Sequence, residues 1–140
     1  MRVLDDAEIR RLLRQAWGDS RAGTPEGHEE GGFVLRAADG SLAVERWPRG
    51  ISDEIVVPAH PGGRRNGLLI LATFHTHPNL DPVYQQEPSL TDIRAVRLDS
   101  DLSHPEYEGE YVISQETLYL IRKDGSVEVV GPTPQVLPPA

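Results

Sequence analysis

One run of apolar residues, LLILATFH at 68–75, limits the folds open to this chain more than any other stretch. Successive side chains of a β-strand point to opposite faces of its sheet, so a strand that is apolar on both faces needs cover on both. The run is also too short to cross a bilayer as a helix. It therefore predicts a central strand in a sheet that has other layers packed on each side.

Two segments have the pattern of helices that could supply this cover. Residues 5–17 predict the first, because apolar residues recur there at helical spacing and an aspartate near its start can act as the cap. Residues 89–101 predict the second, with Ile93 and Val96 facing inward. The apolar residues of the first helix are Ile9, Leu12, Leu13 and Ala16.

Shorter apolar runs on both sides of residues 68–75 predict the other strands. An Asp-Gly pair at 39–40 predicts a hairpin turn between the first two runs. The chain has 140 residues, and we expect a single α/β domain over residues 1–131, with a mixed sheet flanked by helices. The proline-rich tail at 132–140 is expected to be disordered. The predicted strands are 31–37, 41–47, 53–59, 110–115, 117–123 and a last strand within 124–131, after a second Asp-Gly turn.

The charge and the residue types of the chain exclude several classes of function. The formal net charge is -8, so we expect neither a nucleic-acid partner nor an anionic membrane surface. The chain has no cysteine, which excludes disulfides and cysteine-based zinc sites, so a metal would have to be held by His, Asp or Glu. No segment at the start resembles a signal peptide, and we expect a cytoplasmic protein.

The central strand is followed by polar residues that suit a metal site. His75 and His77 are two positions apart, so in a strand they share one face, and Pro78 then ends the strand. Two imidazoles on one face can bind the same metal ion, at about 2.0–2.1 Å each. The carboxyl end of a strand is also where open α/β sheets place their ligands. The alternative is a pair of surface histidines without a ligand.

Two acidic positions could complete a hydrolytic metal site. Asp92 lies in Ser89-x-x-Asp92 at the start of the second helix, which fits a capping box. A capping residue in the first turn can also face a cleft, so the two roles are compatible. Upstream, Glu29 and Glu30 precede two glycines that lead into a strand. Hydrolysis at a metal needs a base, which a glutamate can provide, although such a pair also fits a solvated turn.

These residues together resemble the motif of the JAB/MPN metallopeptidases, also called the JAMM family, over roughly residues 28–130. The resemblance implies the family's fold, a mixed sheet sandwiched by helices and related to the cytidine-deaminase fold. The two-glycine form of the first block resembles bacterial members. The blocks stand in the family's order and are Glu29-x-Gly31-Gly32, His75-Thr76-His77-Pro78 and Ser89-x-x-Asp92.

The resemblance also implies roles for five residues. His75, His77 and Asp92 would hold one zinc ion per chain, Glu29 would be the general base, and Ser89 would stabilise the oxyanion of the tetrahedral intermediate. Glu29 takes this role rather than its neighbour because of its spacing from the second glycine. The implied reaction is hydrolysis of a peptide or isopeptide bond in a protein or peptide substrate. Such a substrate could be a ubiquitin-like modifier or a protein of a toxin or defence system.

The chain departs from the family in one spacing, which keeps alternatives open. Fourteen residues separate His77 from Asp92, more than is usual in the family. Asp81 or Glu87 in this segment could therefore be the third ligand instead. Two other functions also fit the residues, namely an inactive MPN-type binding or scaffold domain and a metal-dependent phosphoesterase of the PHP type, which needs further ligands. The sequence favours no particular oligomeric state.

Overall fold

The computed structural model describes residues 2–81 and 86–139. In this part of the chain seven strands form one mixed sheet in the order β2-β1-β4-β5-β6-β7, and β3 pairs with the start of β4. Paired strands are antiparallel except β4 and β5, which are parallel. The strands are β1 Gly31–Arg36, β2 Leu42–Arg46, β3 Arg64–Arg65, β4 Leu68–Thr76, β5 Glu110–Ile113, β6 Thr117–Ile121 and β7 Val127–Pro132.

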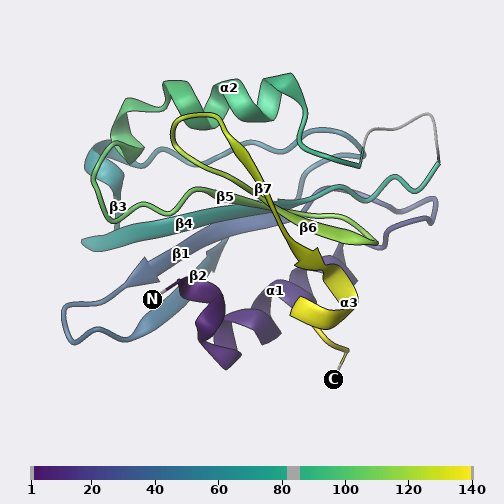
Figure 1. Ribbon diagram of the computed structural model, residues 1–140, viewed down its shortest axis with the longest axis horizontal. Helices are drawn as coiled ribbons and strands as arrows, with labels where there is room; N and C mark the ends of the chain where they lie inside the picture. Colours follow the sequence, from purple (N-terminus) through teal and green to yellow (C-terminus); the bar gives the residue numbers. More distant parts are fainter. Residues whose placement is uncertain (1, 82–85, 140) are drawn as a thin grey trace.

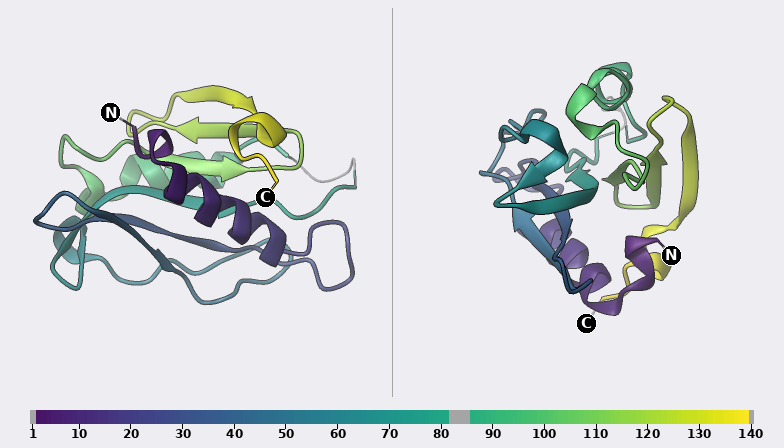
Figure 2. Two further views of the ribbon diagram at one scale, coloured as in Figure 1. Left: turned by 90° about the horizontal axis from the view of Figure 1, so that it is seen from below. Right: turned by 90° about the vertical axis from the view of Figure 1, so that its left-hand side faces the viewer.

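Helices cover both faces of this sheet. Helix α2 lies on one face, and α1 and α3 lie on the other (Figures 1 and 2). The prediction of an α/β protein with a mixed, helix-flanked sheet is thereby confirmed. No helix in the described residues combines the length and apolarity needed to cross a membrane. The helices are α1 Ala7–Asp19, α2 Leu90–Leu98 and α3 Thr133–Val136, with 3-10 turns η1 Val3–Asp5, η2 Pro61–Gly63 and η3 Ser100–Leu102.

β4 is the central strand that its apolar run predicts. Ala72 and Phe74 belong to the core under α1, while Ile70 belongs to the core under α2, which also contains Val96 of that helix. All four side chains are at most 3% exposed. Burial of a phenylalanine, isoleucine or valine side chain contributes about 1.5–3 kcal/mol, so the two cores hold β4 firmly in place. Thr73 and His75 alternate with Ala72 and Phe74 and so face α2.

Helix α1 also follows its sequence pattern. It begins after Asp6, whose carboxylate accepts hydrogen bonds from the backbone N–H groups of Glu8 and Ile9. These two N–H groups have no partner inside the helix, which is why an aspartate stabilises this position. Three residues of the predicted apolar face are buried, with Ile9 at 1% exposure and both Leu13 and Ala16 at 0%, while Leu12 is only partly buried.

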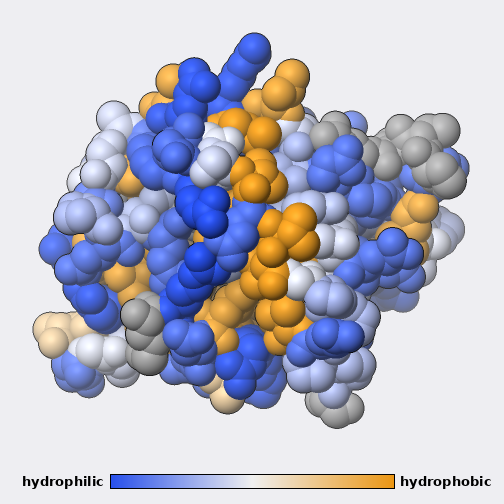
Figure 3. All heavy atoms as spheres, in the orientation of Figure 1, coloured by the Kyte–Doolittle hydropathy of each residue, from blue (hydrophilic) through white to orange (hydrophobic). Residues whose placement is uncertain are grey.

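The edge strand β7 differs from β4 in its exposure. Val127 and Val129 are 41% and 65% exposed. Apolar residues gather in a band on the face of the molecule that Figure 3 shows. An apolar run thus predicts complete burial only at the centre of the sheet, where neighbouring strands and both helical layers surround it.

Residues 53–59, which the sequence predicts as a strand, form none in the structure. The prediction was wrong because it depended on the β-propensity of Ile55, Val56 and Val57, which is decided in practice by packing. Val56 is 74% exposed and Val57 41% exposed, and Pro58 has no N–H to donate to a neighbouring strand. The segment instead crosses the surface as irregular chain and lines one side of the candidate site described below.

The tail at 132–140 differs from the predicted disorder. Thr133–Val136 form α3, and Leu137 is fully buried in the core under α1. The Thr133 hydroxyl donates to Ser114 O over 2.8 Å, which ties the tail to the end of β5. Proline-rich composition favoured disorder, but one buried leucine and this hydrogen bond fix the segment. The last residue of the tail lies outside the described residues.

Candidate metal centre

The two histidines lie at the carboxyl end of β4, where hydrogen bonds hold the backbone on two sides. Thr76 N donates to Glu30 O over 2.9 Å, and Glu30 N donates to the Thr76 hydroxyl over 3.0 Å. On the other side, His77 N donates to Ile113 O over 2.8 Å. His75 and His77 therefore project from a backbone that both neighbouring segments fix.

The structure brings His75, His77 and Asp92 together. His75 Nε2 lies 3.2 Å from His77 Nε2, and Asp92 Oδ2 lies 3.2 Å from His77 Nε2 and 3.6 Å from His75 Nε2. A tetrahedral ion with ligands at 2.0–2.1 Å requires its ligand atoms to be about 3.3 Å apart. The three atoms therefore form a triangle of the size that a tetrahedral metal needs.

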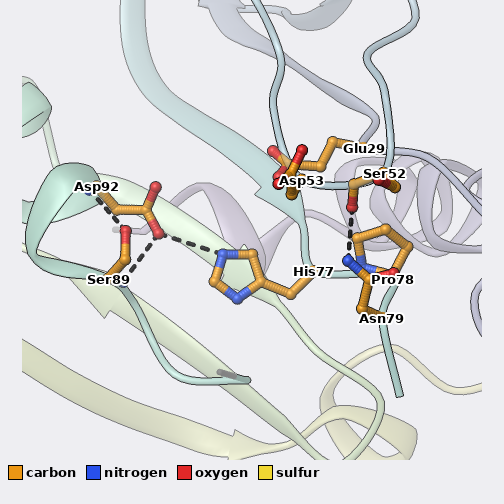
Figure 4. A pocket seen from close by; sticks show the side chains of 8 residues that line it. All are labelled: Glu29, Ser52, Asp53, His77, Pro78, Asn79, Ser89 and Asp92. Carbon is orange, nitrogen blue, oxygen red and sulfur yellow. Dashed lines mark hydrogen bonds and ion pairs between the residues drawn. The ribbon is translucent and has the colours of Figure 1, made fainter. Parts of the chain in front are cut away.

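Asp92 serves as a helix cap and as the third member of this group. Ser89 is the N-cap of α2, and its hydroxyl accepts from Asp92 N over 3.0 Å. Ser89 N in turn donates to Asp92 Oδ2 over 3.0 Å, and this is the same oxygen that faces the histidines (Figure 4). The predicted capping box is confirmed, and it sets the direction of the carboxylate. The first turn of α2 thus adds the third side chain to the two that β4 supplies. We call the candidate metal ligands His75, His77 and Asp92 the ligand group.

The other ring nitrogen of each histidine has a partner. His77 Nδ1 lies 2.9 Å from Gln86 O, and since a carbonyl only accepts, Nδ1 carries the proton. His75 Nδ1 lies 2.8 Å from Glu110 Oε2. Both contacts leave Nε2 directed at the ligand group. Sequence reasoning missed Glu110, because only the parallel pairing of β5 with β4 brings it to the site.

The charges within the group stabilise one another. Burial works against the charged form of His75, but the carboxylates of Glu110 and Asp92 outweigh it and raise the pKa of His75 well above 6.5. Burial likewise disfavours ionised Asp92, but the neighbouring imidazoles of His75 and His77 hold the pKa of Asp92 far below its ordinary range. Without a metal, a proton on His75 supplies the positive charge that these carboxylates require, and a bound cation would replace it.

Two adjoining clefts meet at the ligand group, and Glu29, Asp53 and Asp92 line both. His77 and Ser89 line the cleft drawn in Figure 4, in which Glu29 and Asp53 lie across from Asp92. The site is therefore open to the surface, and the predicted base and the predicted oxyanion residue both border it.

Glu29 has an unusual acidity for a glutamate. Burial raises the pKa of Glu29 to about 7, and the charges of Asp92 and Asp53 add to this rise. His75 and His77 oppose the rise. A carboxylate with a pKa near neutrality is suited to accept and release a proton at physiological pH.

The carboxylate of Glu30 contacts His28 and Arg46 rather than the clefts at the ligand group. It lies 2.5 Å from His28 Nε2 and accepts from an Arg46 guanidinium N–H over 2.6 Å. Arg46 also pairs with Asp19 over 3.1 Å. Of the two adjacent glutamates, only Glu29 lines the clefts at the ligand group, as its spacing in the motif predicts.

Asp81 and Glu87, the other candidates for the third ligand, are both exposed. Among the described residues, the group of metal-ligating side chains that contains both histidines is completed by Asp92 and includes neither of them. The long segment between His77 and Asp92 therefore leaves the ligand group intact.

Comparisons of the chain with protein-family models, with curated proteins and with solved structures find no match. The function must therefore be argued from the chemistry of this site.

Proposed function

We propose that the protein is a zinc-dependent metallopeptidase of the JAB/MPN type, with that family's fold, which hydrolyses a peptide or isopeptide bond in a protein or peptide substrate. The observation that carries the proposal is the triangle of His75 Nε2, His77 Nε2 and Asp92 Oδ2, with separations of 3.2–3.6 Å, beside a cleft that Glu29 lines. A ubiquitin-like modifier or a protein of a toxin or defence system would be a substrate of this class.

The donor set supports zinc as the metal. Two imidazoles and one carboxylate are ordinary zinc ligands, and three protein ligands leave a fourth position open, as in catalytic zinc sites. The backbone carbonyl that accepts from His77 and the carboxylate beside His75 are the partners that such ligands usually have. A bound zinc ion would polarise the scissile carbonyl and lower the pKa of a water molecule in the site.

Glu29 is the proposed general base. Its backbone is fixed by two hydrogen bonds, since Glu29 N donates to Ile51 O over 2.8 Å and Gly50 N donates to Glu29 O over 2.9 Å. With a pKa near 7, the carboxylate can take a proton from the attacking water and pass it to the departing amine. A cation at the ligand group would favour its ionised form, which is the form that a base requires.

Ser89 is the proposed donor to the oxyanion. Its hydroxyl oxygen accepts from Asp92 N, so the O–H remains available to donate. Ser89 lines the same cleft as Glu29. A donor held by a helix cap requires little reorganisation when negative charge develops on the carbonyl oxygen.

A phosphoesterase of the PHP type receives less support. That chemistry needs further His and Asp ligands, and no other such residue among those described joins the group of His75, His77 and Asp92.

Metal content and hydrolysis together test the proposal. We expect about one zinc ion per chain by plasma mass spectrometry, and loss of that zinc in a His75→Ala/His77→Ala variant purified identically. Glu29→Gln should keep the zinc and lose hydrolysis in a screen of peptide and isopeptide substrates. Absence of zinc from the wild type, even after zinc is supplied and the excess removed, would overturn the proposal. Zinc binding without hydrolysis of any substrate would favour a binding domain.

A further inference from the structure

Behind His75 lies a chain of hydrogen bonds that leads away from the ligand group. Glu110 Oε2 lies 2.8 Å from His75 Nδ1. The other oxygen, Oε1, accepts from the Thr73 hydroxyl over 2.9 Å. The Thr73 hydroxyl also lies 2.7 Å from the Tyr107 hydroxyl. The Thr73 hydroxyl has a single proton, which it donates to Glu110, so the Tyr107 hydroxyl is the donor to Thr73. Both carboxylate oxygens of Glu110 therefore have a partner.

The four side chains of this hydrogen-bonded series are buried or nearly so. His75, Thr73 and Tyr107 are 3%, 2% and 7% exposed, and the side chain of Glu110 is 12% exposed. Thr73 and Glu110 are direct neighbours in the parallel pairing of β4 with β5. His75 and Glu110 border one of the two clefts, but their low exposure limits the competition from water for these hydrogen bonds. The pairing of the two strands fixes the position of Glu110 beside β4.

We propose that Glu110 is a positioning residue that presents His75 Nε2 to the metal, and that Thr73 and Tyr107 hold Glu110 in place. The role rests on the metal site of the proposed function but not on its hydrolytic step. A neutral imidazole carries one proton, and a carboxylate facing Nδ1 places that proton on Nδ1. Nε2 then keeps its lone pair for the metal, and the ring keeps its orientation.

The chain provides a matched control two residues before Glu110. Glu108 accepts from the Tyr111 hydroxyl over 2.7 Å and from Val3 N over 2.8 Å. Like Glu110, it is a partly buried carboxylate near the start of β5, and it accepts a hydrogen bond from a hydroxyl group. Its partners belong to the core on the α1 side, away from the ligand group. Removing its charge tests stability without disturbing His75.

The test compares zinc dissociation constants of Glu110→Ala, Glu110→Gln and Glu108→Gln with that of the wild type, by competition with a chelator. Affinities are compared at alkaline pH, where proton competition at His75 is weakest. We expect Glu110→Ala to weaken zinc binding about 10- to 100-fold, as is usual for such partners of metal ligands. Glu110→Gln should weaken binding less, since its amide oxygen can still accept from Nδ1. Glu108→Gln should leave the affinity unchanged.

A nitrogen-15 NMR spectrum of the zinc-loaded protein gives a second readout that a purely structural role would not move. We expect the wild type to show a His75 Nδ1–H protected from exchange with water, and Glu110→Ala to lose that protection. Unchanged affinity together with unchanged Nδ1–H exchange in the Glu110 variants would overturn the positioning role while leaving the proposed function standing. Should Glu110→Ala fail to fold, Glu110→Leu, which also lacks an acceptor but fills more of the space, decides by the same two measurements. A wild type that binds no zinc would overturn both proposals.

Discussion

Glu29 and Glu30 are adjacent in the chain, and each leaves only 8% of its surface exposed. Glu30 lies in a cluster with His28 and Arg46, whose donors contact both of its oxygens. Glu29 instead lines the clefts at the ligand group, where burial raises its pKa to about 7. Two glutamates with equal burial thus differ in whether neighbouring donors offset the cost of burying a negative charge. One is suited to hold the structure together and the other to transfer a proton.

The largest expected effect of this difference is on hydrolysis. Loss of a general base lowers kcat by about 100- to 10,000-fold. If Glu29 has this proposed role, we expect that loss in Glu29→Gln with the zinc content unchanged. Glu30→Gln keeps an acceptor for Arg46 and should stay within a few-fold of the wild type. The measurement is initial rate on any substrate that the screen identifies. A larger loss in Glu30→Gln than in Glu29→Gln would reverse the assignment of the two roles.

The second effect concerns stability and falls on Glu30. Removing one partner of a buried ion pair costs about 3–5 kcal/mol, and we expect Glu30→Ala to lie at about 3 kcal/mol because Arg46 is 31% exposed. Asp19→Ala removes the other partner of Arg46, whose side chain is 50% exposed, and should cost less than about 1 kcal/mol. Urea unfolding of the zinc-free proteins gives both values. Equal losses in the two variants would mean that burial does not distinguish these pairs.

The proposed ligand residues and the partners around them differ in how far the sequence could predict them. His75, His77 and Asp92 belong to local patterns, a strand end and a capping box, whose geometry follows from a few neighbouring residues. Glu110 could not be found in this way, because its role depends on which strand lies beside β4. The pairing of Glu30 with Arg46 is likewise a contact between two strands.

The fold shows the same limit. The apolar run of β4 predicts its own burial, since no other environment suits it. Residues 53–59 have strand propensity but form no strand, and Leu137 is buried by a core that the tail's composition does not reveal. Local patterns therefore predicted helices α1 and α2, the central strand and the three side chains that converge at the candidate metal site. The wrong predictions concerned segments whose structure depends on contacts with distant parts of the chain.

The third effect is the pH dependence of stability that Glu29 produces in the zinc-free protein. Its raised pKa means that between about pH 4.5 and 7 the folded protein keeps a proton that the unfolded chain has released. Stability therefore falls as pH rises through this window, and the penalty remains above it. Glu29→Gln removes the penalty and should be more stable than the wild type at pH 8 by about 3 kcal/mol, since the pKa rises from 4.5 to about 7 and each pH unit is worth about 1.4 kcal/mol.

Denaturant unfolding of both proteins at pH 4, 6 and 8 measures this difference. It should be near zero at pH 4, where Glu29 is protonated in both the folded and the unfolded state, and it should grow toward pH 8. A difference that is constant across this range would mean that Glu29 titrates at its ordinary pKa.

The smallest expected effect is a change, on zinc binding, in the stability difference between Glu29→Gln and the wild type. In the zinc-free protein, His75 and His77 already lower the pKa of Glu29, although burial outweighs them. A divalent ion at the ligand group places more positive charge there than the proton it replaces on His75. The negative charge of Glu29 would then be offset by a nearby cation, much as that of Glu30 is by Arg46.

We expect the extra stability of Glu29→Gln over the wild type at pH 8 to shrink by about 1 kcal/mol when both proteins are saturated with zinc. The measurement repeats the unfolding series with excess zinc, using Asp19→Ala as a control whose difference from the wild type zinc should not alter. An advantage that stays the same with zinc would place the ion too far from Glu29 for that carboxylate to act on the attacking water.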